Sequence, residues 1–262
     1  MNATDTFELL LIRHAESANN AKPVYERVCD PPITPRGRLQ ADHLADWMRS
    51  ISLDVLVTSP FRRTLETSYP ILKRRACPVQ VWHDVFEKGG CYHGHEESSF
   101  VGAEGMNRRQ IERFFQPQRQ LAGVVAGEGT AGQQPESETI VEESLGDEFS
   151  LNIDDEIGDG GWWACRPREQ IEQMEERAKK VACRLVETFG GTRQRVALVI
   201  HADFKRELLR VLLKDILCLD SVGAIANTSV SVLRGCSEGN WQLSSLNSVT
   251  HLPSRLITGR EF

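Results

Sequence analysis

One short stretch near the amino terminus constrains the fold more than any other part of this 262-residue chain. Leu9 to Ile12 is an unbroken apolar run that follows Phe7. Such a run is typical of a strand buried on both faces in a parallel sheet. It ends abruptly in Arg13 and His14. Open α/β sheets hold their ligand sites at the carboxyl ends of such strands, so these two polar side chains mark a candidate site.

The rest of the sequence alternates between strand and helix patterns. Three further apolar runs, at Val55–Thr58, Val79–Trp82 and Val196–Ile200, predict short buried strands. Two later runs, Ser229–Leu233 and Trp241–Leu246, predict an antiparallel pair at one edge. Apolar residues at helical spacing separate the first four strands. This alternation predicts an α/β fold, a three-layer α/β/α sandwich with a mostly parallel sheet.

Cap signals indicate where the helices begin and end. Thr34-Pro35 and Ser59-Pro60 each join an N-cap residue to a proline at the first helical position. Pro167 is expected to open a long helix that Gly190-Gly191 ends. Asp203 is expected either to cap the next helix or to point into the site.

The charge of the chain is unevenly distributed. The formal net charge is −6, yet the segment from Gln120 to Cys165 has 11 acidic residues and no Lys, Arg or His. Without it the remainder carries −6 + 11 = +5. A mildly basic remainder suits an anionic substrate, and it is neither basic nor patterned enough to predict nucleic-acid binding. We expect a single domain over residues 1–262, with an acidic, flexible insertion at about 120–161.

The cysteine pattern and the hydropathy of the sequence indicate in which cellular compartment the protein is expected. The seven cysteines are odd in number and scattered, with no Cys-x-x-Cys pair, which favours reduced thiols. No apolar run approaches the length of a membrane span, and Met1–Thr6 is polar without a signal-peptide core. We therefore expect a cytoplasmic protein that does not engage a membrane.

Two local features admit a second interpretation. Cys91, His93 and His95 alternate and carry metal-ligand chemistry, so a metal site is conceivable. The sequence has no further Cys/His pair at suitable spacing, and a polar loop lining the substrate pocket is preferred. Trp162-Trp163 offers a contact for a partner or substrate, but a buried anchor after the insertion is the favoured interpretation.

The polar cluster after the first strand also resembles a known motif. Arg13–Ser17 with Asn20 resembles the opening motif of the histidine phosphatase superfamily, which includes cofactor-dependent phosphoglycerate mutases and many phosphomonoesterases. Ser59–Thr67 resembles a second motif of that family. The resemblance covers about Phe7–Glu87 and Trp162–Leu233, and it implies a phosphoglycerate mutase-like fold.

The resemblance implies a role for each matching residue. The implied catalytic residues are His14, Glu87 and His201, and the implied phosphate-binding residues are Arg13, Asn20, Arg63 and Ser17. A neutral His14 can attack phosphorus and form a phosphohistidine, while Glu87 protonates the leaving oxygen. Arginine offers a planar fork of donors that suits phosphoryl oxygens. This double displacement needs no metal and no cofactor.

Local alternatives remain open at three of these positions. Asn19 could take the place of Asn20, and Asp84 lies close enough in sequence to replace Glu87. Ser17 could simply cap the local backbone.

Three functions remain under consideration. The first is a phosphomonoesterase, a phosphatase acting on a phosphorylated small molecule or a phosphoprotein, with its oligomeric state open. The second is a phosphoglycerate mutase-type phosphotransferase, which must exclude water and grip a second anionic group, for which Lys88, Arg108 and Arg109 are candidates. The third is a catalytically weak interaction module in which Asp203 spoils the site. The complete catalytic set argues against the third function. The insertion does not resemble the substrate-binding segment of the mutases, so the first function is preferred to the second.

Overall fold

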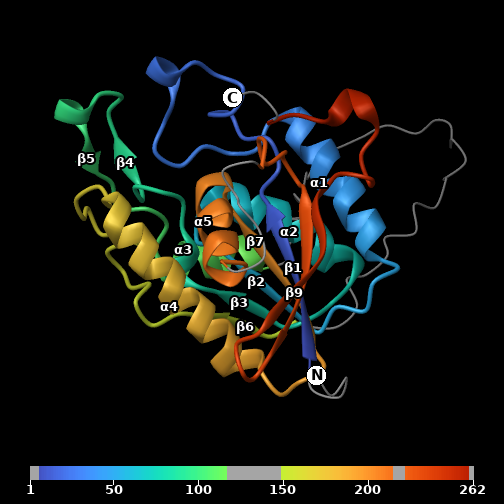
Figure 1. The fold of residues 1–262 in the computed structure, drawn as a ribbon. Helices are drawn as coiled ribbons and strands as arrows, with labels where there is room; N and C mark the ends of the chain where they lie inside the picture. The colour runs from blue at the N-terminus through green and yellow to red at the C-terminus, as the bar shows by residue number, and fades with distance from the viewer. Residues whose placement is uncertain (1–5, 117–148, 215–221, 260–262) are drawn as a thin grey trace, which may run out of the picture.

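The computed structural model describes residues 6–116, 149–214 and 222–259, which form an α/β fold around a seven-stranded sheet (Figure 1). The strands are β1 (Thr6–Arg13), β2 (Val55–Thr58), β3 (Val79–Val81), β4 (Tyr92–His93), β5 (Val101–Gly102), β6 (Leu151–Ile153), β7 (Arg195–Ile200), β8 (Val230–Cys236) and β9 (Trp241–Ser248). The helices are α1 (Pro35–Met48), α2 (Arg62–Arg74), α3 (Arg108–Phe115), α4 (Ile171–Phe189) and α5 (Ala202–Leu212).

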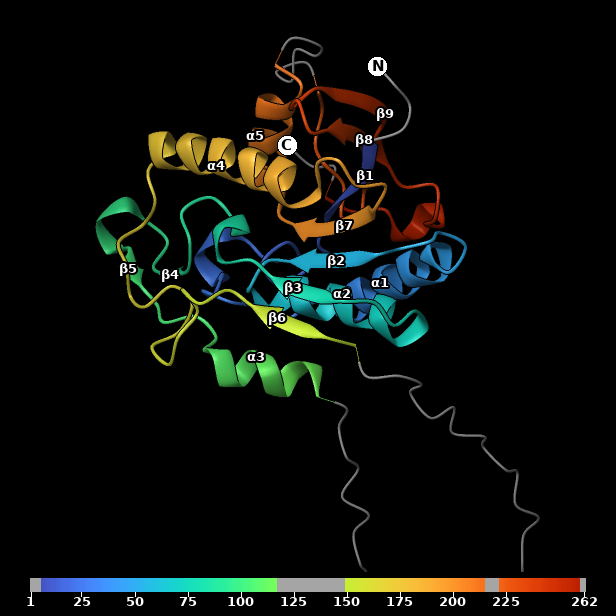
Figure 2. The same cartoon turned by 90° about the horizontal axis from the view of Figure 1, so that it is seen from below.

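The sheet has the order β6-β3-β2-β7-β1-β8-β9, and β4 and β5 form a separate hairpin. The five strands from β6 to β1 run parallel, while β8 and β9 are antiparallel. Figure 2 shows α4 and α5 covering one face of the sheet, with α1, α2 and α3 on the other. The predicted mostly parallel sandwich, with an antiparallel pair at one edge, is therefore confirmed.

The alternation of side chains along β1 explains why Leu9 to Ile12 is an unbroken apolar run. Leu10 and Ile12 belong to the core that β1 shares with α1 and α2. Leu9 and Leu11 belong to the core on the opposite face, beneath α4 and α5. All four are at most 1% exposed, and burying each such side chain contributes roughly 1.5–3 kcal/mol. A strand with helices on both faces has no polar side.

Two helices begin later in the chain than the cap signals predicted. Thr34 does cap α1, accepting a hydrogen bond from the Gly37 backbone at 2.9 Å. By contrast, α2 begins at Arg62, because the Ser59 hydroxyl lies against His201 instead. Helix α4 begins at Ile171, where the Gln170 side chain forms a capping box, and not at Pro167.

The cap of α5 also differs from the sequence prediction. His201 occupies the N-cap position, and it makes no side-chain cap hydrogen bond. Asp203 instead lies in the first turn of the helix, where it is exposed. Of the two roles considered for Asp203, the capping role is therefore wrong.

The prediction of a flexible insertion at about 120–161 is wrong for its last part, residues 149–161, which the structure describes. Residues 120–148 lie outside the described parts of the chain. Beyond them, Leu151–Ile153 forms β6, the edge strand that pairs with β3. Asp154 then binds Arg184 of α4 at 2.6 Å. Trp162 and Trp163 are 1% and 3% exposed, which confirms a buried anchor. Among the described helices, none is long and apolar enough to cross a membrane.

Candidate active site

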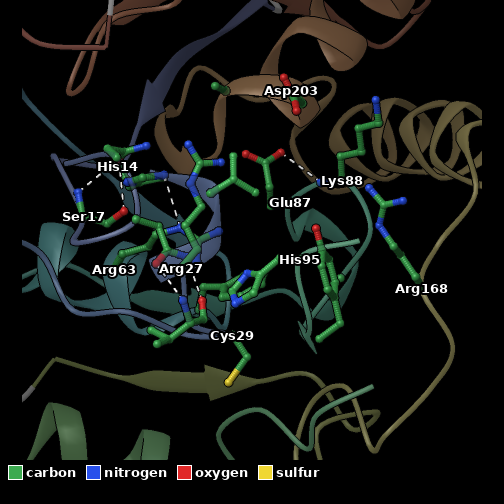
Figure 3. A pocket seen from close by; sticks show the side chains of 18 of the residues that line it. His14, Ser17, Arg27, Cys29, Arg63, Glu87, Lys88, His95, Arg168 and Asp203 are labelled. Atoms are coloured by element: carbon green, nitrogen blue, oxygen red, sulfur yellow. Dashed lines mark hydrogen bonds between the residues drawn. The ribbon is translucent and has the colours of Figure 1, made fainter. Parts of the chain in front are cut away.

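The carboxyl ends of the central strands open into one cavity of about 510 Å³ (Figure 3). Arg13 and His14 lie at the end of β1, Arg63 lies in the first turn of α2 after β2, and Glu87 follows β3; all four line the cavity. The shared direction of these parallel strands brings residues far apart in sequence to one edge. His201 follows β7 and lies beside His14, with ring centroids 5.2 Å apart.

The two ring nitrogens of His14 have different partners. Nδ1 donates to the carbonyl oxygen of Ala15 at 2.6 Å, and Nε2 accepts from Nε of Arg63 at 3.3 Å. Because the partner groups fix these roles, the ring is the neutral tautomer with its lone pair on Nε2. Burial lowers the pKa of His14 well below its usual value, and the charges of Arg63 and Arg13 lower it further. His14 is therefore an uncharged imidazole with a lone pair on Nε2.

Arg13 is anchored through one end of its guanidinium group. Nη1 donates to the carbonyl oxygens of Ile225 and Gly259, while Nε is buried without a hydrogen-bond partner among the described residues. Burial lowers the pKa of Arg13 to about 10. The group stays protonated at neutral pH and keeps an unused donor.

Arg63 is held by an aromatic ring and a carboxylate. Its guanidinium carbon lies 4.0 Å from the ring centroid of Phe61, and Nη1 lies 4.0 Å from Asp30. Burial lowers the pKa of Arg63, whereas Asp30 and Glu87 oppose this change. Asp30 also accepts a hydrogen bond from the Arg62 backbone, and burial raises its pKa to about 7. Asp30 therefore joins the first loop to the start of α2.

Asn20 is oriented by its neighbours. Its side-chain oxygen accepts from the backbone and the hydroxyl of Ser17, at 3.0 and 3.1 Å, and from Nδ2 of Asn227 at 3.3 Å. Asn20 lines the cavity, and its side-chain NH₂ is available to donate a hydrogen bond to a ligand there. In Asn19, by contrast, the side-chain NH₂ donates to the Val28 carbonyl oxygen and the side-chain oxygen accepts from the Val28 N–H. The geometry favours Asn20 over Asn19 as a donor and makes Ser17 its support.

His201 is fully buried, and one of its nitrogens lacks a partner. Nε2 lies 2.8 Å from the hydroxyl of Ser59, while Nδ1 has no hydrogen bond to the described residues. Burial lowers the pKa of His201 well below its usual value, and Arg63 and His14 add to the effect. The imidazole is therefore neutral in this structure and offers a single N–H.

Glu87 is fixed by two backbone donors. Its Oε1 accepts from the backbone N–H groups of Lys88 at 2.9 Å and of Phe204 at 3.2 Å. Burial raises the pKa of Glu87, and the charge of Asp203 raises it further. The alternative, Asp84, does not line the cavity, because it pairs with Arg184 at 3.2 Å.

A metal site and a distant anion grip were also considered from the sequence. Within the described ranges, no group of three His, Cys, Asp or Glu side chains is arranged to hold a metal ion. Arg108 is committed to the carbonyl oxygens of Ile153 and Asp154, and Arg109 to Asp159. Of the three candidates for binding a second anionic group, Lys88 lines the cavity, whereas Arg108 and Arg109 do not.

The polar loop at 91–95 was expected to line the substrate pocket, and its Tyr92, Gly94 and His95 line the cavity. Sequence reasoning missed Arg168, which also lines the cavity and is far from every motif in the sequence. A backbone hydrogen bond positions Arg168: the N–H of its neighbour Glu169 donates to the Gly89 carbonyl oxygen at 3.1 Å. A lone arginine after an unpatterned segment offers no sequence signal.

The chain belongs to the histidine phosphatase superfamily. Residues 9–128 and 136–249 match that superfamily's branch 1. Over 72 residues the chain is 38% identical to phosphoserine phosphatase 1 of Hydrogenobacter thermophilus, covering 28% of this chain and 34% of that one. Over 79 residues it is 34% identical to the adenosylcobalamin/alpha-ribazole phosphatase of Escherichia coli, covering 30% and 39%. These matches span little more than a third of either relative.

Solved structures extend the likeness of fold to nearly the whole chain. YhfR of Bacillus stearothermophilus aligns with a TM-score of 0.58 at 18% identity, over 94% of this chain and 98% of that one. The mycobacterial glucosyl-3-phosphoglycerate phosphatase aligns with a TM-score of 0.54 at 20% identity, over 93% and 99%. At such identities the likeness establishes the shared fold.

Proposed function

We propose that this protein is a phosphomonoesterase that works through a phosphohistidine on His14 and needs no metal ion. The observation that carries the proposal is the neutral His14, whose Nε2 faces Arg63 in a cavity that also holds Arg13. Support also comes from two buried nitrogens without partners among the described residues, Nε of Arg13 and Nδ1 of His201. Nε of Arg13 always carries a hydrogen, and Nδ1 of His201 carries one in the tautomer whose Nε2 accepts from Ser59, so each can donate to a phosphoryl group.

In the first step, Nε2 of His14 attacks phosphorus in line with the leaving oxygen. Arg13, Arg63 and the amide of Asn20 hold the phosphoryl oxygens and stabilise their charge in the transition state. Glu87 gives its proton to the leaving oxygen, so the alcohol departs neutral. The raised pKa of Glu87 makes the protonated form available closer to neutral pH than in an exposed carboxyl group.

In the second step, a water molecule attacks the phosphohistidine. Glu87, now ionised, takes a proton from that water as its oxygen bonds to phosphorus. The bond from phosphorus to Nε2 breaks, and its electron pair returns to a neutral His14. Inorganic phosphate leaves, and the protonation states of both residues match those at the start.

A mutase would use the same first step but would have to protect the phosphohistidine from water. The cavity rim carries exposed residues, including Val24 at 53% and Val28 at 54%. An accessible rim favours hydrolysis. Phosphoserine and alpha-ribazole phosphatases among the relatives agree with a small phosphorylated substrate.

The test is hydrolysis of 4-nitrophenyl phosphate in the presence of chelator. We expect turnover by the wild type, loss of at least about 10³-fold in His14→Ala, and little change in His93→Ala. His93 is an exposed histidine that does not line this cavity, and it controls for a general effect of histidine removal. Acid-labile phosphate on His14 should be trapped by rapid quenching.

Two results would contradict the proposal. Turnover that chelator abolishes would make a metal ion necessary. Wild type that neither turns over aryl phosphate nor binds phosphate or vanadate would favour the interaction module.

A further inference from the structure

The far end of the cavity carries positive charge that the two proposed catalytic steps do not use. Lys88 and Arg168 both line the cavity, and both are half-buried. Neither forms an ion pair with any residue in the described ranges. By contrast, the nearby Arg177 is buried and pairs with Glu169 at 2.6 Å. Figure 3 shows Lys88 and Arg168 at the end of the cavity away from His14.

Arg168 is held in place by aromatic rings, and its hydrogen-bonding edge is left unused. Its guanidinium carbon lies 4.4 Å from the ring centroid of Phe100 and 5.2 Å from that of Tyr92. These two rings pack edge to face, with centroids 4.7 Å apart. Nε of Arg168 is buried, and the described residues supply no acceptor for it. An ordered guanidinium with free donors is suited to a carboxylate or a phosphate.

Hydrogen bonds of the backbone fix the positions of Lys88 and Arg168 relative to Glu87. Lys88 follows Glu87 directly, and its N–H donates to the Glu87 carboxylate at 2.9 Å. The turn continues through Gly89, whose carbonyl accepts from the N–H of Glu169, the neighbour of Arg168. A Cβ at Gly89 would come within 3.1 Å of Nε of Arg168, so the two segments are in close contact. The cations therefore lie on the side of Glu87, where the leaving group departs.

We infer that the alcohol released by this enzyme carries a second anionic group, a carboxylate or a phosphate, which Lys88 and Arg168 bind. The inference rests on the proposed function, since it assigns the leaving-group side of that same reaction. The substrate class is a phosphomonoester with two separated anionic ends. One end is held by Arg13 and Arg63, and the other by Lys88 and Arg168.

The test compares matched esters that differ only in their tail. Alkyl phosphates are paired with ω-carboxyalkyl phosphates and alkyl bisphosphates of the same chain length, and kcat/KM is measured for each. We expect the wild type to prefer an anionic tail by about 10- to 100-fold, the range of one or two charge-assisted hydrogen bonds. The carboxylate and bisphosphate arms show which anion is preferred.

Variants assign the preference to these side chains. Arg168→Met and Lys88→Met should each lower kcat/KM on the anionic ester by about tenfold more than on the alkyl ester, and Arg168→Lys should restore part of it. Lys180→Met, which removes an exposed charge on α4, should leave the ratio unchanged. Wild-type turnover with a ratio near one overturns this inference alone, as does an equal loss on both esters. No turnover of any ester overturns it together with the proposed function.

Discussion

At the scale of single residues, Asp203 is a carboxylate placed in a cavity built for anions. It lines the cavity from the first turn of α5, and its charge raises the pKa of Glu87. It also favours the charged form of Arg13. Asp203 therefore has opposing effects: it repels a phosphate, and it favours the protonated form of the proposed general acid, Glu87.

Asp203→Asn should move the alkaline limb of the kcat/KM profile to lower pH. The general acid must be protonated, so kcat/KM falls as pH rises through the pKa of Glu87. Removing a neighbouring negative charge lowers that pKa, and the fall begins earlier. Because Asp203 is exposed, we expect a shift of less than about one pH unit. Asp159→Asn, on an exposed residue outside the cavity, serves as the control. A limb that stays in place or moves upward would contradict this account.

Asn20 allows the donor role to be separated from local structure. Asn20→Asp keeps an oxygen for the hydrogen bonds from Ser17 and Asn227, but replaces the NH₂ with a second carboxylate oxygen. We expect kcat/KM to fall by about 10²- to 10³-fold, as when a donor to a transition-state oxyanion is removed. The melting temperature should change little. If Asn20→Asp retained activity, the amide would not contact the phosphoryl group.

At the scale of elements, α4 supports the turn that carries Glu87. Nε of Arg177 donates to Glu169 at 2.6 Å. Nη1 donates to the carbonyl oxygens of Asp84 and Phe86, at 2.8 and 3.0 Å. Its guanidinium carbon also lies 3.6 Å from the centroid of the Phe86 ring. One buried arginine therefore joins the helix, the segment before it and the strand-end turn.

Arg177→Met should lower both the stability and kcat. It leaves the Glu169 carboxylate buried and unpaired, which costs about 3–5 kcal/mol of unfolding free energy. Adding Glu169→Gln removes the unpaired negative charge, so the double variant should regain much of the lost free energy of unfolding. Its kcat should stay low, because the carbonyls of Asp84 and Phe86 still lack their donor. Denaturant unfolding and steady-state kinetics measure the two effects, and a double variant as unstable as Arg177→Met would contradict the explanation.

The elements also show how far sequence alone could predict this protein. Long apolar runs with helices on both faces, such as β1, were predictable because burial on two sides leaves a clear pattern. The start of α2 was not, because the Ser59 hydroxyl serves His201 across 142 residues of sequence. Strand β6 was hidden by its brevity within an acidic segment. Arg168 reaches the cavity only through tertiary contacts, which no local pattern encodes.

At the scale of the whole molecule, the candidate site draws on distant parts of the chain. Arg13 near the amino terminus donates to the carbonyl of Gly259 near the other end. The central strands carry the remaining groups, on a sheet whose faces are both covered by helices. An anion bound at this edge contacts groups that come together only in the folded protein. Its binding energy therefore adds to the free energy of unfolding of the entire fold.

Inorganic phosphate or vanadate should raise the melting temperature even with chelator present. A ligand at 100 times its Kd adds about 2.7 kcal/mol to the free energy of unfolding. For a chain of this size, each kcal/mol corresponds to a shift of about 2–4 °C, so we expect roughly 5–10 °C. Arg63→Ala should abolish most of the shift, because it removes a buried donor fork from the cavity, while Lys180→Met should preserve it. A shift that survives Arg63→Ala would place the bound anion elsewhere on the molecule, and one that needs a divalent cation would argue against metal-free binding.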